Sequence, residues 1–491
     1  MILSIDQGTT GTTVLLFDQQ GEILARSYAE FTQYYPKPGW VEHDACEIWD
    51  ITLGCIRQVI QAAEVQPADL KGIGITNQRE TTVLWDRRTG KPVHKAIVWQ
   101  CRRSRYLCEK LIKEGHEKEI EQTTGLVVDA YFSGTKLMWM FAEEPELRQR
   151  AEAGELCFGT IDSWLIWNLT QGQSHVTDPT NASRTLMYDI KEKSWSSSLC
   201  DVMGVPGAVL PEVKPSAGIF GYTDEAILGA RVPISGVAGD QQAALFGQCC
   251  VEPGQVKNTY GTGCFVLMYT GEVQCRSRHG LLTTIACDAY GQPAYALEGA
   301  VFTAGAAVQW LRDEMKMIEH ASDTQAIAES IESTQGVYLV PAFTGLGAPY
   351  WDMQARGSLV GLSRGAGRAE VVRATLESIA YQTRDLVEAM SRDAGQTISH
   401  MRVDGGACAN DFLMQFQADM LDGEIQRPVM IESTALGAAM LAGIGVNLWD
   451  PQALPDKLTR VANRFLPQMN SAQRERHYEG WKRAVARTVS Q

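Results

Sequence analysis

The chain has 491 residues, of which 45% are hydrophobic and 21% are charged, and its formal net charge is -14. This length and composition exclude a disordered or collagen-like chain and predict a folded protein with more than one domain. The excess of acidic residues argues against binding to nucleic acid or to an anionic membrane surface, because both need clustered positive charge. Small molecules are the expected partners.

No segment of the sequence predicts membrane insertion or export. The longest nearly apolar stretch, residues 435–446, is shorter than the roughly 20 residues that span a bilayer. The amino terminus starts with a strand-like run and lacks the basic and small-residue signals of a secretion leader. The 12 cysteines are scattered without a Cys-x-x-Cys pair, which favours reduced thiols. We therefore expect a cytoplasmic protein.

Strand-like and helix-like segments alternate along the chain. Apolar residues with helical spacing cover residues 48–62, and strand-like runs cover residues 72–76, 82–85 and 96–99. This alternation predicts an α/β fold. Residues 2–18 form a strand, a Gly-Thr turn and a second strand, and residues 256–269, roughly 250 positions later, repeat the pattern. A duplicated domain explains this recurrence.

The boundary between the two copies must be short, because no long polar linker divides the chain. Segment 247–254, which contains glycine and proline, is the best candidate for a hinge. We predict an N-terminal domain of residues 1–249 and a C-terminal domain of residues 250–491. From about residue 447 onward, polar segments punctuated by proline predict peripheral helices that end with residues 481–491.

Two segments place reactive groups at the ends of predicted strands. Asp6-Gln7-Gly8-Thr9-Thr10-Gly11 suits phosphate groups, because glycine lets backbone N–H groups turn toward an anion and threonine adds hydroxyl donors. Its plainer interpretation is a tight hairpin. Further on, a strand ends in Gly239-Asp240 and runs into a helix. Asp240 is either the N-cap of that helix or a carboxylate that projects into a ligand cleft.

Three more segments add groups that suit a small polar molecule. Asn77-Gln78-Arg79-Glu80-Thr81 follows a strand, Trp99 ends another, and Tyr131 opens segment 131–139. Arg79 and Glu80 offer donors and an acceptor for hydroxyl groups, and Trp99 offers a flat apolar wall. Taken one at a time, these residues also fit a surface ion pair and a core tryptophan.

Together with Asn258-Thr259-Tyr260-Gly261-Thr262-Gly263-Cys264-Phe265 and residues 341–351 and 373–380, these strings resemble the FGGY family of carbohydrate kinases over essentially the whole chain. The resemblance implies two actin-like domains, with the RNase H-like fold of the sugar kinase/hexokinase superfamily and a cleft between them. It implies ATP-dependent phosphorylation of glycerol to sn-glycerol 3-phosphate by in-line transfer. The alternative acceptor within the family is another small polyol or a ketose.

On the acceptor side, the resemblance implies that Asp240 is the catalytic general base. A carboxylate is too weak a base to deprotonate an alcohol beforehand, so Asp240 is expected to orient the hydroxyl and accept its proton late. Trp99 and Phe265 are expected to sandwich the carbon chain, which favours glycerol over larger sugars. The residues implied to hold the hydroxyl groups are Arg79, Glu80, Tyr131, Asp240 and Gln241.

On the nucleotide side, the resemblance implies a role for Thr9, Thr10, Gly11, Thr262, Gly305, Gln309, Gly406 and Asn410. Asp6, with Asp240 nearby, is expected to hold a Mg²⁺ ion through water across the β- and γ-phosphates of ATP. Catalysis in such a transfer consists mostly of positioning and charge neutralisation, and domain closure excludes water. Family members are often oligomers, so a homodimer or homotetramer is expected.

The sequence departs from the family pattern at a few places. Thr13 stands where many relatives carry an arginine, which removes one expected contact to the nucleotide phosphates. Residues 224–231 keep only two positions of the Gly-rich basic loop of fructose-bisphosphate-regulated members, and residues 468–475 differ from the segment with which some members bind a transport regulator. Neither form of regulation is therefore predicted.

Two other functions stay open from the residues alone. Gly361-Leu362-Ser363-Arg364-Gly365 fits the G-x-S-x-G nucleophile elbow of serine hydrolases, although it lies inside the second family signature at residues 357–377. An actin-like fold also serves ATP-gated binding and filament proteins, so fold alone does not dictate a kinase. The family signature argues against the hydrolase, and the polyol-binding residues Arg79, Glu80, Trp99, Tyr131 and Phe265 argue against a binding or filament protein.

Overall fold

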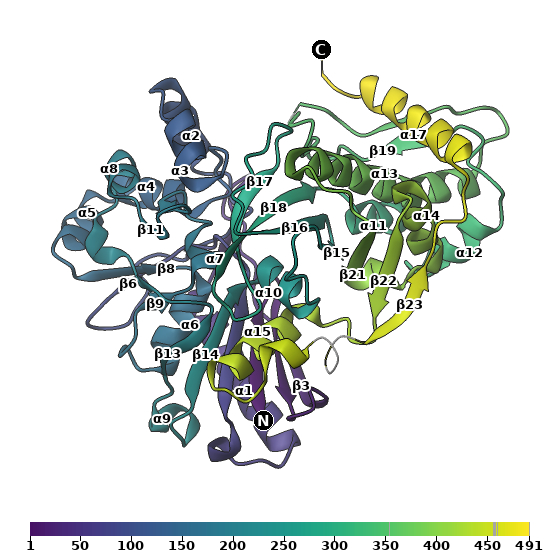
Figure 1. Ribbon diagram of the computed structural model, residues 1–491. Helices are drawn as coiled ribbons and strands as arrows, with labels where there is room; N and C mark the ends of the chain where they lie inside the picture. The colour runs from purple at the N-terminus through teal and green to yellow at the C-terminus, as the bar shows by residue number, and fades with distance from the viewer. Residues whose placement is uncertain (353, 455–457, 459, 491) are drawn as a thin grey trace.

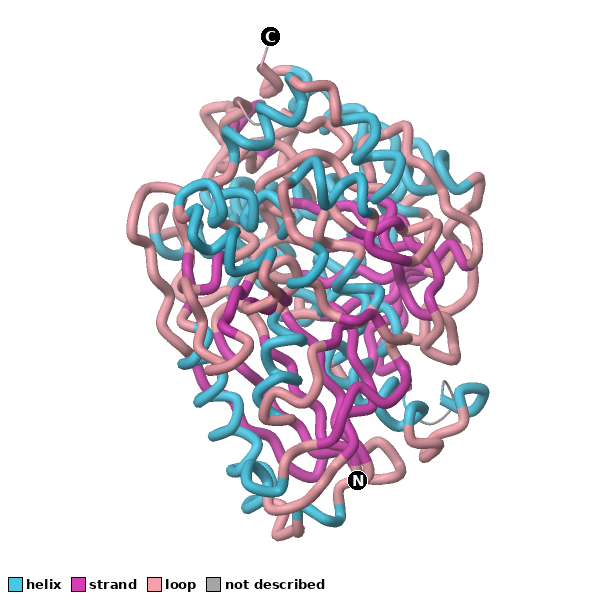
Figure 2. Tube along the Cα trace, turned by 90° about the vertical axis from the view of Figure 1, so that its left-hand side faces the viewer, coloured by secondary structure: helices cyan, strands magenta, loops and turns pink. Residues whose placement is uncertain are grey.

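Two twisted β-sheets, each covered by helices, make up the protein (Figure 1). The computed structural model describes residues 1–352, 354–454, 458 and 460–490. The amino terminus lies at the end of the molecule opposite the carboxyl terminus, as Figure 2 shows from a view turned by 90°. None of the helices in these described ranges is both long and apolar enough to cross a membrane.

The first sheet is built from strands β1 (Ile2–Gln7), β2 (Gly11–Phe17), β3 (Ile23–Glu30), β5 (Gly72–Asn77), β13 (Ala217–Tyr222) and β14 (Pro233–Gly239). Their order is β13-β14-β5-β1-β2-β3. Strands β1, β2 and β3 pair antiparallel, whereas β5 and β14 join parallel to β1 and to each other. The strand predicted at residues 72–76 and the hairpin predicted at residues 2–18 are confirmed.

The second sheet repeats this arrangement. Its strands are β15 (Val256–Tyr260), β16 (Cys264–Gly271), β17 (Leu282–Cys287), β18 (Pro293–Val301), β21 (His400–Asp404), β22 (Glu424–Pro428) and β23 (Val461–Phe465). The order is β17-β18-β16-β15-β21-β22-β23. Strands β15, β16 and β18 pair antiparallel, and β21 and β22 join parallel, as β5 and β14 do in the first sheet. The predicted duplication is therefore visible in the strand order.

Helices from both halves of the sequence cover the first sheet. Helix α1 (Ala45–Ala62) packs on one face, where the side chain of Asp44 caps it. Helix α15 (Ser433–Gly445) packs on the other face, although it belongs to the second half of the chain. Strands β1 and β5 are buried almost throughout because they are covered on both faces.

Helix α10 (Asp240–Gly247) lies between the two sheets and packs against α15 (Figure 1). Each of these helices follows the last parallel strand of its own sheet, β14 and β22 respectively. Glycines let the two backbones approach closely: a Cβ atom added at Gly437 of α15 would lie 1.9 Å from the carbonyl oxygen of Ala243 of α10. The helix pair therefore joins the halves of the molecule.

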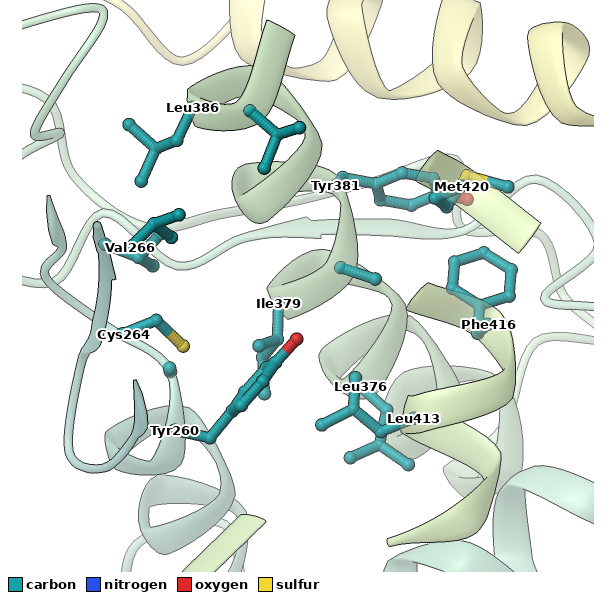
Figure 3. Packing of buried hydrophobic residues seen from close by; sticks show 14 of the residues in the cluster. Tyr260, Cys264, Val266, Leu376, Ile379, Tyr381, Leu386, Leu413, Phe416 and Met420 are labelled. Carbon is teal, nitrogen blue, oxygen red and sulfur yellow. The ribbon is translucent and has the colours of Figure 1, made fainter. Parts of the chain in front are cut away.

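The core of the second half forms between its sheet and two helices, α13 (Arg368–Ala394) and α14 (Asp411–Leu421). Figure 3 shows side chains of β15 and β16 facing Ile379 and Leu386 of α13. The hydroxyl of Tyr260, which is fully buried, donates to Oε1 of Gln417 at 2.9 Å. This buried phenol therefore has a hydrogen-bond partner inside the core.

The carboxyl-terminal helix is not peripheral, contrary to the prediction. Helix α17 (Ser471–Ala486) places Trp481 in the core of the second half with no exposed surface. The indole of Trp481 stacks on Tyr381 and donates to the buried carboxylate of Asp385 at 2.8 Å. The polar composition of the segment hid a single apolar face, because only one stripe of a helix needs to be buried.

The remaining helices are α2 (Arg105–Lys113), α3 (Glu117–Thr124), α4 (Ser133–Glu143), α5 (Pro145–Glu152), α6 (Ile161–Leu169), α7 (Pro179–Ala182), α8 (Ser197–Met203), α9 (Glu225–Leu228), α11 (Gly305–Asp313) and α12 (Asp323–Glu329). Short strand pairs are formed by β4 (Glu42–His43), β6 (Val83–Asp86), β7 (Ala96–Ile97), β8 (Leu156–Gly159), β9 (Val176–Thr177), β10 (Tyr188–Asp189), β11 (Ser194–Trp195), β12 (Glu212–Val213), β19 (Tyr338–Val340) and β20 (Ser358–Val360). The strands predicted at residues 82–85 and 96–99 are β6 and a shorter β7.

Candidate active site

Three predicted site residues lie at the same edge of the first sheet. Asp6 is in β1, Arg79 follows β5, and Asp240 follows β14. The register pairs Asp6 with Thr76 and Ala238 with Thr76, so the carboxyl ends of the three parallel strands are level. Ligands of open α/β sheets bind at this edge. Asp240 is not an N-cap, because Gly239 occupies the N-cap position of α10.

Arg79 is held by carboxylates from both halves of the chain. Its Nε lies 3.1 Å from Oδ1 of Asp240. Its two terminal nitrogens donate to the two carboxylate oxygens of Glu298, on β18, at 2.6 and 3.1 Å. Nη1 also donates to Oε1 of Gln242 at 3.2 Å. The guanidinium is therefore fixed by a bidentate pair, which has the most restrictive geometry that arginine offers.

A second arginine closes this buried network. Nε of Arg184 donates to Oε1 of Glu80 at 2.6 Å, and its Nη2 donates to Oε1 of Glu298 at 2.9 Å. The side chains of Arg79, Glu80, Arg184 and Glu298 are each no more than 2% exposed. Burial opposes ionisation of Glu298, but Arg184 and Arg79 outweigh it and lower the pKa of its carboxyl to about 2. Two positive and two negative charges thus balance away from water.

Lys257 of β15 is a further buried charge beside this network. Its ammonium donates to Oε1 of Gln241 and to Oγ1 of Thr259. Burial lowers its pKa to about 8, against the opposing effect of Asp404 and Asp240. Gln241, which was predicted to hold a hydroxyl group, therefore already has its carbonyl oxygen engaged by the second sheet.

The carboxyl of Asp6 is the most unusual acid at this edge. Burial, then the charges of Asp240 and Glu432, raise its pKa to about 8. No hydrogen bond to this carboxyl is formed by any residue that the structure describes. Such a group lacks a positive partner, and carboxylate oxygens are what Mg²⁺ prefers. In the described part of the chain no three His, Cys, Asp or Glu side chains converge, so a metal here would keep water ligands.

Aromatic side chains adjoin the phosphate-loop candidate. The indole N–H of Trp99 donates to Oγ1 of Thr9 at 2.9 Å, and its ring meets Tyr131 edge to face with centroids 5.5 Å apart. The guanidinium of Arg184 lies over the ring of Tyr131 at 5.6 Å. Burial and then Glu80 raise the pKa of the Tyr131 phenol, which therefore stays a neutral donor. Phe265 of β16 packs beside a cluster that includes Leu245; its sandwich with Trp99 stays a prediction.

The remaining nucleotide candidates are spread over the two sheets. Thr9 and Thr10 lie in the turn between β1 and β2, and Gly11 begins β2. Thr262 lies in the equivalent turn between β15 and β16. The backbone N–H of Gly305, at the start of α11, donates to the carbonyl of Gly261, so this helix start abuts the Thr262 turn. Gln309 is exposed on α11.

Gly406 and Asn410 lie at the carboxyl end of β21, the strand next to β15. Gly405 has φ of +84°, and a Cβ atom there would lie 2.4 Å from the carbonyl oxygen of Tyr260, so only glycine fits. Asn410 caps α14 by accepting from the N–H of Leu413, and its Nδ2 donates to Thr324. Its side chain thus has structural partners already.

Sequence reasoning missed Arg184, Glu298 and Lys257. A signal was present for Glu298, because it is a lone acid within the apolar strand Pro293–Val301, where an unpaired charge would be costly. Arg184 follows Asn181-Ala182-Ser183 and had no pattern of its own. The Ser363 segment forms no catalytic triad among the described residues: Ser363 is exposed and its hydroxyl accepts only from the N–H of Gly365.

Comparison with known proteins places this site in a family. The sequence models of the N-terminal and C-terminal domains of the FGGY family of carbohydrate kinases match residues 1–247 and 256–446. The chain belongs to the FGGY family. The resemblance seen in the sequence is thereby confirmed, together with the two-domain actin-like fold and the assignment to the kinases.

Individual FGGY kinases match over nearly the whole chain. A glycerol kinase of Halorhodospira halophila is 56% identical over 99% of this chain and 96% of its own length. One of Petrotoga mobilis is 57% identical over 99% of this chain and 98% of its own length. The crystal structure of Plasmodium falciparum glycerol kinase with ADP superimposes with a TM-score of 0.94 at 39% identity, covering 100% of this chain and 98% of that one.

Proposed function

We propose that this FGGY kinase transfers the γ-phosphoryl group of ATP to a terminal hydroxyl of glycerol, forming sn-glycerol 3-phosphate and ADP. The single observation that carries the proposal is the Arg79–Asp240 pair at the sheet edge, in a chain that is 56% identical to a glycerol kinase over 99% of its length. The acceptor is expected to lie between the two domains, 1–249 and 250–491. The two family matches end and begin on either side of this proposed boundary.

Asp240 is the proposed general base. As the glycerol oxygen bonds to the γ-phosphorus, the bond from phosphorus to the leaving ADP oxygen breaks, and the hydroxyl proton passes to Asp240 and then to solvent. Asp240 is suited to this role because its side chain remains 31% exposed, unlike the buried acids around it. Nε of Arg79, 3.1 Å away, fixes the orientation of the carboxylate before the acceptor arrives.

The other site residues divide between acceptor and nucleotide. Glu80, Tyr131 and Gln241 are proposed to pair with the hydroxyl groups of glycerol, between the walls Trp99 and Phe265. A site built this way rejects analogues that leave its buried polar groups unpaired. The residues proposed to contact ATP are Thr9, Thr10, Gly11, Thr262, Gly305, Gln309, Gly406 and Asn410.

Asp6 and Asp240 are the residues that would hold Mg²⁺. Asp6, which has no cationic partner among the described residues, and the nearby carboxylate of Asp240 fit a hard cation that keeps several water ligands. Such an ion would neutralise charge on the β- and γ-phosphates of ATP. The cytoplasmic location and the dimeric or tetrameric state stay predictions of the sequence.

The test is ADP release by the purified protein with Mg-ATP, comparing glycerol with other small polyols and ketoses. Glycerol is expected to give the highest kcat/KM, and Asp240→Asn is expected to lower kcat by about 10² to 10⁴, the usual contribution of a general base. Asp69→Asn, an exposed acid on the same domain, is the matched control and should keep full activity. A higher kcat/KM with a ketose would show that glycerol is not the preferred acceptor. The absence of any acceptor-dependent turnover would refute the kinase proposal.

A further inference from the structure

Glu298 joins the second sheet to both arginines of the acceptor site. It lies on β18, 219 positions from Arg79 and 114 positions from Arg184. Its carboxylate binds Arg79 through both oxygens and Arg184 through one of them. Its side chain is 2% exposed, and both carboxylate oxygens are already engaged by the two arginines.

We infer that Glu298 is a positioning residue for phosphoryl transfer: it holds Arg79 against Asp240 and Arg184 against Glu80, so that the acceptor site is completed by the second sheet. This inference rests on the proposed function. The Glu298 carboxylate engages Nη1 and Nη2 of Arg79 and leaves Nε as the donor nearest Asp240. Nε of Arg79 and the backbone N–H of Gln241 both approach Oδ1 of Asp240, so Oδ2 stays available for the acceptor.

Loss of the Glu298 charge would release this arrangement. Arg79 also lies 3.8 Å from Glu80, so a guanidinium freed from Glu298 has two other carboxylates to pair with. A bidentate pair with Asp240 would occupy both oxygens of the proposed base. Arg184 would keep only Glu80 as a carboxylate partner among the described residues, and its Nη1 is already buried without an acceptor. The positions of Asp240 and of Glu80 in the acceptor site would therefore change together.

A second contact between the same elements supports this coupling. Gln242, the third residue of α10, accepts from Nη1 of Arg79 and donates through Nε2 to Thr284 and to the carbonyl of Ile285 near β18. Strands β17 and β18 are paired neighbours in the second sheet. Gln242 binds β17 directly, and Glu298 of β18 binds Arg79, so both strands hold the start of α10. The position of Asp240, which begins α10, thus depends on the second sheet.

The test compares Glu298→Gln with Glu377→Gln. Glu377 is an equally buried acid of the second half, paired with Arg373 at 2.9 Å on α13 and remote from the acceptor residues. For Glu298→Gln we expect kcat/KM for glycerol to fall at least tenfold, while the KM for ATP stays within twofold of wild type. Glu377→Gln, which also removes a buried acid from an arginine pair, should keep kcat/KM for glycerol within twofold.

The inference is overturned if Glu298→Gln keeps kcat/KM for glycerol within twofold, or if it loses glycerol and ATP kinetics equally, as a general loss of structure would cause. If Glu298→Gln does not fold, Glu298→Asp replaces it: the shorter side chain keeps the charge but cannot reach both arginines. The same fall in kcat/KM for glycerol, with an unchanged KM for ATP, is expected. Wild-type protein without glycerol-dependent ADP release would instead refute the proposed function, whatever the variants do.

Discussion

The close contact between α10 and α15 predicts a large effect from one added methyl group. In Gly437→Ala the new Cβ atom would lie 1.9 Å from the carbonyl oxygen of Ala243 and 3.0 Å from the backbone nitrogen of Gly247. Ordinary contact begins at 3.4 Å, so the helices must separate by about 1.5 Å at this point. Both obstacles are backbone atoms, which cannot rotate away as a side chain does.

The matched control is Gly54→Ala. Gly54 also lies inside a helix, α1, but a Cβ atom there meets nothing within 4 Å. Each substitution gains about 1 kcal/mol of helix propensity. Overpacking at Gly437 costs about 1–3 kcal/mol, and the rigid obstacle favours the upper end of this range. The difference between the two variants, which cancels the propensity gain, should therefore reach about 3 kcal/mol.

Thermal unfolding followed by differential scanning fluorimetry measures this difference. At about 2–4 °C per kcal/mol for a unit of 150–250 residues, Gly437→Ala should melt about 6–12 °C below Gly54→Ala. Because Asp240 is the first residue of α10, displacement of α10 should also lower kcat in Gly437→Ala alone. Equal melting temperatures of the two variants would refute the argument, since they would show that the helix contact yields without cost.

Two further predictions concern the metal site and acid stability. Asp6→Asn removes the half-buried carboxyl near Asp240, so the Mg²⁺ concentration for half-maximal activity should rise at least tenfold, whereas the KM for glycerol should change little; an unchanged Mg²⁺ titration would contradict this. Burial lowers the pKa of His175 from 6.5 to about 4, so the unfolded chain binds its proton first as the pH falls. The stability contributed by this histidine is therefore complete above pH 6.5 and is lost as the pH falls through 4, by up to about 3 kcal/mol. Urea unfolding of His175→Gln should show a correspondingly weaker pH dependence than wild type, and parallel pH curves would contradict the assignment.

Local patterns in the sequence predicted the strands and turns that carry the site, because the end of a strand and a Gly-Thr turn can each be recognised from a few adjacent residues. Asp6 and Asp240 each follow or end an apolar strand, and the parallel register then places them together. Glu298 and Arg184 could not be predicted in the same way. Their pairing depends on the packing of one sheet against residues 114 positions earlier, which no local pattern encodes.

The covering of the first sheet by α15 escaped prediction for a related reason. A division into two halves by sequence assigns residues 433–445 to the second domain, and their apolar, Gly- and Ala-rich composition only states that the helix is buried. Close contact decides which sheet this helix covers. A Cβ atom added at Gly74 would lie 2.2 Å from the carbonyl oxygen of Ala438, so β5 can pack against α15 only because residue 74 is glycine. Trp481 was likewise misjudged, because its polar neighbours outweigh it in any average over the segment.

The duplicated architecture explains why the proposed metal site belongs to one copy only. The last parallel strand of each sheet leads to a helix start, with Asp240 at α10 and Glu432 at α15, and both charges act on Asp6. When the two Gly-Thr turns are aligned, the position equivalent to Asp6 in the second sheet is Thr259, which is uncharged and accepts from Lys257. The acids at the first turn suit a cation, whereas at the second turn the acid of the neighbouring strand, Asp404, lies beside Lys257. This asymmetry favours a division in which the first sheet binds the metal, the reacting hydroxyl and part of the phosphate chain, and the second sheet binds the rest of the nucleotide.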